Sequence, residues 1–427
     1  MSVQYERKEL GGGIHFSVIL DKRYKTNFFS VRLITKLSPE TASANSIIPS
    51  ILSKSCESHP SQTEFNRMLT ALYGSTVYDG CGKLGDYQTL SVNGTAIGDR
   101  YALEGENICG QLIDIILECV TRPALENGVF PEKEFELKRR ELIDDILTEI
   151  NDKRSYAFMQ TSKIVYKGEP AANSVNGTLE TAKSLTPKTV YEQYRRLISE
   201  AQIEVIFAGG EYPEGAEEKI IGAFKPADRK VPSDIIIAPS PVKHQSVSAE
   251  DELDVVQCKM ILAYKFRSEN EPAVRLLNMV LGATPVSKLF TNVREKLSLC
   301  YYCSSSVNLM KKTLFVDSGV SLDKVEAAKA EINRQIEEIK AGNVTESELS
   351  AAKLAISNSA KAYYDYPKAL AGWYFNNSIR GISDDPEEIA AKVCAVTMDE
   401  LKEAAASLVP DTEYLLRGLD ESAGDDE

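Results

Sequence analysis

The 427-residue sequence predicts an α+β protein built from two related halves, and three observations lead to this prediction. Short segments with strand-like alternation recur in the same order along the chain. Pairs of helix start signals recur between them. A proline-rich stretch with few helix formers separates the two sets. We therefore expect an N-terminal half at residues 1–224, a linker at 225–246, a C-terminal half at 247–419 and an acidic, poorly ordered tail at 420–427.

Three pairs of segments carry strand-like patterns in both halves. The first pair alternates apolar and other residues, which is typical of half-buried strands. The second pair shares a Thr-Leu-x-Val core, and the third pair consists of apolar runs that end in glycine. The pairs are residues 29–37 with 259–266, residues 88–94 with 312–319, and residues 204–209 with 413–418.

Helix start signals are duplicated in the same order. Residues 130–135 open one long helix and residues 344–349 open its counterpart, where Thr345 and Glu348 form an S/T-x-x-E capping box. Further along, Leu-Thr-Pro at 185–187 and Val-Thr-Met at 396–398 each begin a shorter helix. The agreement in order favours an internal duplication over coincidence.

Composition excludes several classes of protein. The chain has 49 Lys and Arg against 63 Asp and Glu, a net charge of −14, which would repel nucleic acid as a general partner. No apolar run approaches the roughly 18 residues of a membrane span, and the first ten residues do not resemble a signal peptide. Eight scattered cysteines fit a reducing cytosol. We expect a soluble, cytoplasmic protein.

A segment of the second half carries a recognisable signature. Residues 281–301 read LGATPVSKLFTNVREKLSLCY, which resembles the L-G, S-x-L-F and R-E-x-x-G-L-x-Y pattern of the insulinase/pitrilysin zinc peptidases, or inverzincins. Ser298 replaces the glycine of that pattern. The resemblance extends over nearly the whole chain and implies two duplicated halves, each an antiparallel sheet with helices packed on it, which enclose a cavity. The matching residues are Arg294, Glu295, Leu299 and Tyr301.

The first half departs from the H-x-x-E-H zinc motif of that family. Its counterpart reads Ser-Ile-Ile-Pro-Ser, so that Ser46 and Ser50 replace the two histidine ligands and Pro49 replaces the water-activating glutamate. Catalytic zinc needs three protein ligands, and its bound water needs a base. Neutral hydroxyls and a proline supply neither. The chain has only three histidines, and no two are close in sequence.

The family's third zinc ligand is a glutamate on a later helix. The corresponding helix here is the one that includes residues 141–152, and the ligand position falls at Asp145 or Ile146. One carboxylate would not hold zinc by itself. We therefore expect this chain to have no metal and no cofactor of its own, with zinc only in a partner subunit.

The resemblance assigns a role to Arg294 and Tyr301. In family members the matching arginine and tyrosine face the zinc site of the other half and help to hold the substrate backbone and the oxyanion. A guanidinium and a phenol suit that role as charged and neutral donors. The competing interpretation is structural, with Arg294 paired to a neighbouring residue and Tyr301 packed against the protein.

Other features of the sequence have plainer interpretations. Cys300 and Cys303 form a C-x-x-C where a strand begins, so we expect their side chains to point to different faces or into the core. His59 follows a short turn and is expected at the surface. The aromatic residues between 363 and 375 are expected to pack in the core or to line the cavity between the halves.

The resemblance leads to one main hypothesis for function. The chain acts as the non-catalytic subunit of a two-chain peptidase and supplies Arg294 and Tyr301 to a zinc-bearing homologous subunit that binds a peptide substrate. It is most similar to the bacterial zinc-less partner associated with elongation factor P aminopentanol modification. The alternative is a peptide-binding scaffold without a peptidase partner. A hydrolase with a relocated site ranks last, because no G-x-S-x-G is present.

Overall fold

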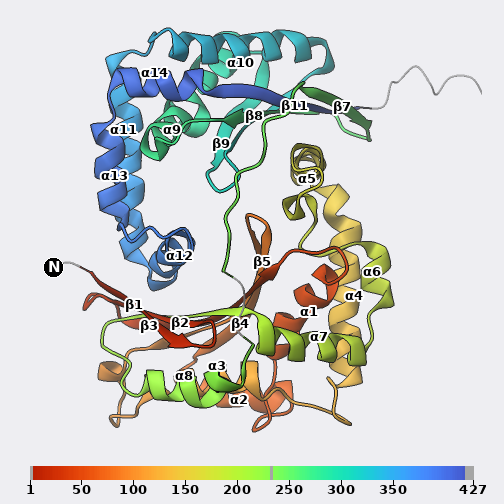
Figure 1. The fold of residues 1–427 in the computed structure, drawn as a ribbon, viewed down its shortest axis with the longest axis vertical. Coiled ribbons are helices and arrows are strands. Elements are labelled where there is room, and N and C mark those ends of the chain that lie inside the picture. Colours follow the sequence, from red (N-terminus) through yellow and green to blue (C-terminus); the bar gives the residue numbers. More distant parts are fainter. Residues whose placement is uncertain (1–2, 231–233, 419–427) are drawn as a thin grey trace, which may run out of the picture. The chain divides into compact units, whose positions relative to one another are not determined.

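The chain forms two compact units, each made of one β-sheet with helices packed on it (Figure 1). The computed structural model describes residues 3–230 and 234–418. The α+β class is therefore confirmed, whereas the acidic tail at 420–427 lies outside the described residues. The first unit holds residues up to Leu147, Asn173–Ile236 and Tyr363–Ser383, and the second holds Thr148–Ala172, Ile237–Ala362 and the residues from Asp384 on.

The sheet of the first unit has six strands in the order β1-β2-β6-β3-β5-β4. The central strands β3 and β6 are almost wholly buried, because helices cover both of their faces. β2 and β6 run parallel, whereas the other neighbours pair antiparallel. The strands are β1 (Gln4–Gly11), β2 (Ile14–Leu20), β3 (Thr26–Lys36), β4 (Thr76–Leu84), β5 (Tyr87–Ile97) and β6 (Gln202–Gly209).

The sheet of the second unit has five strands in the order β7-β11-β8-β10-β9. β7 and β11 run parallel, and the other neighbours are antiparallel. β8 and β10 lie inside the sheet and are buried along their whole length apart from one half-buried residue of β8, Lys259. The strands are β7 (Val247–Glu252), β8 (Cys258–Phe266), β9 (Cys300–Asn308), β10 (Thr313–Val320) and β11 (Leu408–Arg417).

The two sheets share one topology. With β1 set aside, β2, β6, β3, β5 and β4 correspond in order to β7, β11, β8, β10 and β9. Equivalent strands also pair alike, since Val31 faces Val92 in the first sheet and Leu262 faces Val316 in the second. This confirms the predicted duplication. The sheets are mainly antiparallel, as expected, with one parallel pair in each that the sequence did not reveal.

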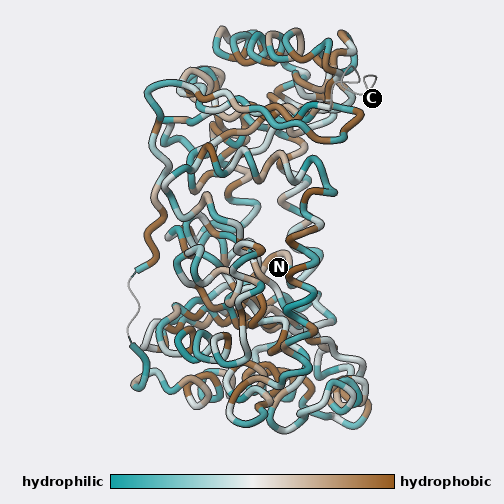
Figure 2. The backbone as a smooth tube through the Cα atoms, turned by 90° about the vertical axis from the view of Figure 1, so that its right-hand side faces the viewer, coloured by the Kyte–Doolittle hydropathy of each residue, from teal (hydrophilic) through white to brown (hydrophobic). Residues whose placement is uncertain are grey.

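Helices of the first unit pack on the sheet with their apolar sides. Side chains such as Ile47, Leu112 and Val190 join the strands in one core, and Figure 2 shows hydrophobic and hydrophilic residues alternating along the helical turns. The helices of this unit are α1 (Ala42–Leu52), α2 (Gln62–Ala71), α3 (Ile108–Thr121), α4 (Glu132–Thr148), α6 (Leu179–Ser184), α7 (Pro187–Glu200), α8 (Ala216–Phe224) and α12 (Pro367–Ser378).

The second unit is built in the same way. Leu276, Ile332 and Leu401 bring three helices onto one face of the sheet, and Ala157 and Val165 bring another helix onto the opposite face. The helices are α5 (Lys153–Val165), α9 (Glu271–Asn278), α10 (Val325–Lys340), α11 (Glu346–Ala362), α13 (Pro386–Ala395) and α14 (Met398–Ala406), with two π-helical segments, η5 (Met279–Ala283) and η6 (Leu289–Lys296).

Each unit contains one helix that comes from the other half of the sequence. α5 packs on β8 and β11 in the second unit, and α12 packs on β3 and β6 in the first. Within the first unit Tyr374 stacks on Tyr5 at 3.9 Å, and Arg32 lies 4.2 Å over the ring of Phe375. The contact units are therefore discontinuous in sequence. The boundaries 1–224, 225–246 and 247–419 describe the sequence repeat and remain a prediction. The cavity that the two halves are expected to enclose also remains a prediction.

The predicted helix signals have the expected geometry. Thr345 and Glu348 exchange hydrogen bonds through both backbone amides at the start of α11, which confirms the capping box. Thr186 and Thr397 are the N-caps of α7 and α14. Among the described residues, no helix is long and apolar enough to cross a membrane.

Candidate functional site

Helix α1 carries the positions that correspond to the missing zinc motif. Its apolar side, with Ile47 and Ile51, is buried in the first core. Ser46 and Ser50 lie one turn apart on the less buried side, where two histidines at this spacing would face the same way. Pro49 lies inside the helix and cannot donate a backbone hydrogen bond.

The hydroxyl groups on this side of α1 are engaged in neutral hydrogen bonds. Ser46 Oγ donates to Asn176 Oδ1 at 2.9 Å, and Ser50 Oγ donates to the carbonyl of Ile47 at 2.8 Å. The Cys81 thiol on β4 also contacts Ser46, and burial raises the pKa of that thiol. These groups do not suit zinc, which prefers thiolate, imidazole or carboxylate ligands.

The helix expected to carry the third ligand adds no carboxylate to this set. Ile146 on α4 packs against the first core, whereas Asp145 is exposed. Within residues 3–230 and 234–418, no three His, Cys, Asp or Glu side chains lie close enough together to hold a metal ion. The donor set around α1 therefore does not fit a catalytic zinc.

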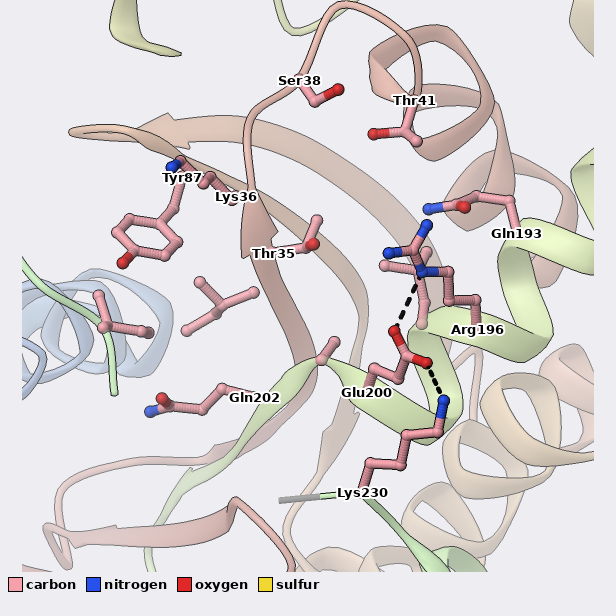
Figure 3. A pocket seen from close by; sticks show the side chains of 14 residues that line it. Thr35, Lys36, Ser38, Thr41, Tyr87, Gln193, Arg196, Glu200, Gln202 and Lys230 are labelled. Atoms are coloured by element: carbon pink, nitrogen blue, oxygen red, sulfur yellow. Dashed lines mark hydrogen bonds and ion pairs between the residues drawn. The ribbon is translucent and has the colours of Figure 1, made fainter. Parts of the chain in front are cut away.

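A cavity of about 560 Å³ lies near the first residues of α1 without reaching the motif positions (Figure 3). It is bounded by the ends of β3, β5 and β6 and by α7. Glu200 accepts a hydrogen bond from Arg196 Nε at 3.0 Å and also pairs with Lys230. None of Ser46, Pro49 and Ser50 lines this cavity.

Tyr301 is exposed in the second unit, and Arg294 is half-exposed. Arg294 lies on η6 with 41% of its side chain accessible, 4.6 Å over the Phe290 ring and 3.5 Å from the carboxylate of Glu295. Tyr301 is 60% accessible. Neither side chain is buried or fixed by a strong partner, so both donors are available to a ligand.

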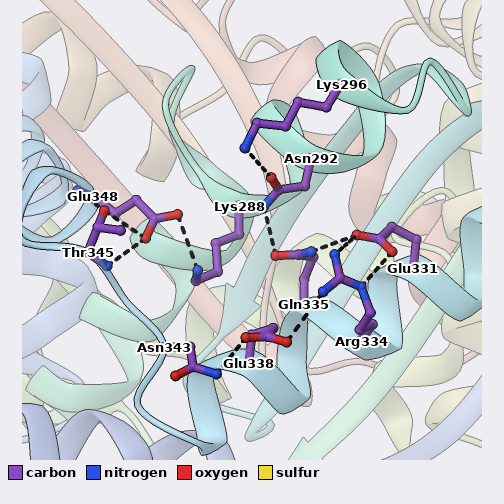
Figure 4. Close-up of polar contacts among 10 residues, drawn as sticks. All are labelled: Lys288, Asn292, Lys296, Glu331, Arg334, Gln335, Glu338, Asn343, Thr345 and Glu348. Atoms are coloured by element: carbon purple, nitrogen blue, oxygen red, sulfur yellow. Dashed lines mark hydrogen bonds and ion pairs between the residues drawn. The ribbon is translucent and has the colours of Figure 1, made fainter.

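The helix that carries Arg294 is held in place by polar contacts from its other residues (Figure 4). Asn292 Nδ2 donates to Gln335 on α10 at 2.8 Å, and Lys288 Nζ lies 3.2 Å from the carboxylate of Glu348 on α11. Lys288 is almost fully buried, so this pair fixes the helix more firmly than a surface ion pair would. These contacts hold the backbone that carries Arg294, whereas its own side chain contacts Phe290 and the carboxylate of Glu295.

Tyr301 projects because it lies in a β-bulge. Cys300 faces Val320 and Tyr302 faces Gly319, so Tyr301 has no opposite residue on β10. The Tyr302 ring covers Gly319, where an added Cβ would lie 2.4 Å from its Cε1. Bulges often re-aim a side chain next to a functional site, and this one turns Tyr301 outward.

The same bulge decides between the two alternatives expected for the C-x-x-C pair. Cys300 and Cys303 were expected on different faces or in the core, but the extra residue between them places both on one face, against the second core. A hydrogen bond from the Cys303 thiol lowers the pKa of Cys300 to about 7. The core alternative is therefore confirmed and the different-face alternative is not, because sequence alternation cannot reveal a bulge.

Comparison with known proteins relates this geometry to a family. The family model described as "Peptidase M16 inactive domain" matches residues 184–356. This chain is therefore similar to insulinase (M16) family proteins and has Ser46, Pro49 and Ser50 at the zinc-motif positions. It is 25% identical over 424 residues to the "Probable inactive metalloprotease YmfF" of Bacillus subtilis, covering 98% of this chain and 99% of that protein. An "Uncharacterized zinc protease" of Rickettsia felis is 21% identical over 69% of this chain and 70% of that protein.

Solved structures show the same fold. A conserved protein from Enterococcus faecalis superposes with a TM-score of 0.88 at 24% identity, covering 98% of this chain and 99% of that one. A protease from Helicobacter pylori superposes with a TM-score of 0.77 at 14% identity, covering 98% of this chain and 100% of that one. A chain of Complex III2 from Candida albicans superposes with a TM-score of 0.70 at 13% identity, covering 98% of this chain and 97% of that one.

The backbone explains why the M16 signature has a glycine where this chain has Ser298. Ser298 has a φ of 48°, in the left-handed region that glycine adopts without a steric penalty. Its carbonyl accepts a hydrogen bond from Lys324 Nζ at 3.0 Å. The turn from η6 into β9 is thus kept, at the cost of strain at one residue.

Two charged or polar clusters of the first unit were not predicted from the sequence. Glu204, buried on β6, accepts a hydrogen bond from Arg7 at 2.6 Å and lies 3.3 Å from His15 Nδ1. His59, expected at the surface, is half-buried, with Nδ1 3.9 Å from Cys56 Sγ. Arg7 and Glu204 are 197 positions apart in sequence, so local patterns gave no signal for that cluster.

Proposed function

We propose that this chain, which is similar to M16-family proteins, is the non-zinc subunit of a two-chain peptidase. It supplies Arg294 and Tyr301 to a peptide held at the zinc site of a homologous subunit that carries H-x-x-E-H. One observation carries the proposal: the motif positions Ser46 and Ser50 are neutral and hydrogen-bonded, while Arg294 is half-exposed and Tyr301 is exposed.

The two side chains have complementary chemistry for peptide cleavage. The Arg294 guanidinium donates charge-assisted hydrogen bonds to a peptide carbonyl. The Tyr301 phenol is a neutral donor to the oxyanion that forms when the carbonyl is attacked. Preorganised donors of this kind stabilise the transition state more than the substrate. The network around Asn292 and Lys288 supports this role by fixing the backbone of η6.

The partner and the compartment follow from the same proposal. The partner is a homologue with an intact zinc motif, and the substrate is a peptide. The resemblance noted in the sequence points to a pair associated with elongation factor P aminopentanol modification. All eight cysteines are free thiols, which supports a reducing cytoplasmic location. The occurrence of this fold within Complex III2 supports its use in multi-chain assemblies.

The test is reconstitution. The chain is purified alone, the zinc-bearing homologue is purified alone, and each is assayed for peptide cleavage beside the mixture. We expect chelator-sensitive cleavage from the mixture and none from this chain. Robust chelator-sensitive cleavage by this chain alone would contradict the proposal, and so would a mixture with no activity beyond that of the homologue.

The scaffold alternative rests on the sheet edges. β4 and β9 are edge strands, and each leaves one row of backbone donors and acceptors for an added peptide strand. Under this alternative a peptide binds to the chain alone, and binding does not depend on Arg294. Binding measured by calorimetry on wild type and Arg294→Ala separates it from the subunit proposal.

A further inference from the structure

Cys300 and Cys303 form a dithiol pair on either side of Tyr301. Cys300 faces Val320 and Cys303 faces Ser318, two residues on the same face of β10. The Cα atoms of two such residues lie about 6.6 Å apart along a strand. This spacing is close to the upper end of the ~4.4–6.8 Å range of Cα separations in disulfides. A small contraction of the bulge therefore suffices to join the two sulfurs.

We infer that Cys300 and Cys303 are a thiol modification site that takes a hydroperoxide as oxidant and closes to an intramolecular disulfide around Tyr301. The disulfide fixes the bulge and changes the direction of the tyrosine side chain. The site lies in the second unit and needs no partner subunit to form, whereas its effect on peptide turnover rests on the proposed function.

The chemistry balances with hydrogen peroxide as the only co-reactant. The Cys300 thiolate attacks one peroxide oxygen, the O–O bond breaks, and hydroxide leaves, which gives a sulfenic acid at Cys300. The Cys303 thiol then attacks the Cys300 sulfur, the S–OH bond breaks, and water leaves. The two thiols lose two protons and two electrons in total, and the peroxide takes up both and becomes two waters.

The environment assigns different roles to the two thiols. Cys300 is half-buried and reachable, whereas Cys303 is 4% exposed and packs in the second core. The hydrogen bond from Cys303 lowers the pKa of Cys300, and the positive charge of Arg294 adds to this effect. Cys300 is therefore the attacking thiolate near neutral pH, and Cys303 is the resolving thiol that needs no contact with the oxidant.

Mass spectrometry of the full chain tests the site. The chain is treated with hydrogen peroxide, free thiols are alkylated, and trypsin is added. Cleavage after Lys296 and Lys311 gives the peptide 297–311, which contains Cys300 and Cys303 and no other cysteine. We expect this peptide to be unalkylated and lighter by two hydrogens in most molecules, and to return to the dithiol after dithiothreitol. The half-exposed Cys394 serves as the control and should remain alkylatable.

Single substitutions complete the test. Cys303→Ser should leave Cys300 as a sulfenic acid that reacts with dimedone, and Cys300→Ser should leave Cys303 unmodified. Stable alkylation of both cysteines after peroxide, or sulfonic acid at Cys300 with Cys303 still free in the wild type, would overturn the inference. If the disulfide forms but turnover of the reconstituted pair is unchanged, the site stands and its link to the proposed function fails.

Discussion

At the scale of single residues, Ser298 illustrates how one backbone angle constrains the motif. Its Cβ is strained at a φ of 48°, and such strain costs about 1–2 kcal/mol for residues other than glycine. Ser298→Gly should therefore raise the free energy of unfolding by about 1 kcal/mol. Urea denaturation measures the change.

The matched control for that variant is Ser306→Gly. Ser306 is an exposed residue of β9 with ordinary strand geometry, and glycine in a strand lowers stability by about 0.5–1 kcal/mol. Opposite signs for the two variants support the strain at Ser298. Equal destabilisation by both would show that no strain is stored there.

The buried carboxylate of Glu204 gives a prediction with a defined pH dependence. Burial raises its pKa, but hydrogen bonds from His15 and Arg7 outweigh that effect and hold the pKa below the ordinary value of 4.5. A lowered folded-state pKa stabilises the protein above about pH 4.5, and this contribution is lost as the pH falls further.

Glu204→Gln should accordingly lower the free energy of unfolding at pH 7 by about 2–4 kcal/mol, since it removes the negative charge that faces Arg7 and the half-buried Arg32. The difference in the free energy of unfolding between Glu204→Gln and wild type should shrink below pH 4.5. Thermal melts of both proteins from pH 7 to pH 3 measure it. A difference in thermal stability between the two proteins that stays constant or widens toward low pH would contradict the ionised state of Glu204.

At the scale of elements, the sequence predicted several strands and helices but not how they combine. Alternation and capping residues are local signals, so β3, β8 and the start of α11 were confirmed. The parallel pairs, the exchange of α5 and α12, and the bulge at Tyr301 depend on contacts between distant segments. The positions of Ser46, Pro49 and Ser50 on one helix were predictable, whereas the dithiol pair was not, because it requires the bulge.

The chemistry of α1 predicts that the isolated chain holds no stoichiometric zinc. Ser46 and Ser50 present neutral hydroxyls, each already donating a hydrogen bond, and such groups are poor zinc ligands. Metal analysis of protein purified without chelators should give far less than one zinc per chain. One zinc per chain that disappears in Ser46→Ala would show that α1 binds metal after all.

The capping box of α11 supports the helix that holds Lys288 through Glu348. Thr345→Ala removes the side-chain acceptor for the Glu348 amide and should cost about 1 kcal/mol of stability. Thr345→Ser keeps the hydroxyl and serves as the control. Chemical denaturation should separate the two variants, and identical midpoints would argue against a contribution from the cap.

At the scale of the whole molecule, the proposed function means that a duplicated scaffold has kept one functional surface and lost another. Both units retain the same strand order, so loss of the zinc motif did not require a change of fold. Under the proposed function, the helix that once held metal now serves structure, and the exposed donors of the second unit serve a partner. Fold and function are therefore separable in this protein.

The central claim is that Arg294 acts on substrate held by a zinc-bearing partner, and its most direct test is turnover per assembled complex. Arg294→Ala is compared with wild type and with Arg267→Ala, an exposed arginine of the same unit outside the motif. The account predicts unchanged melting and assembly with turnover about 10- to 1000-fold lower for Arg294→Ala, the effect of losing one oxyanion-type donor, and no loss for Arg267→Ala. Unchanged turnover per complex for Arg294→Ala would contradict it.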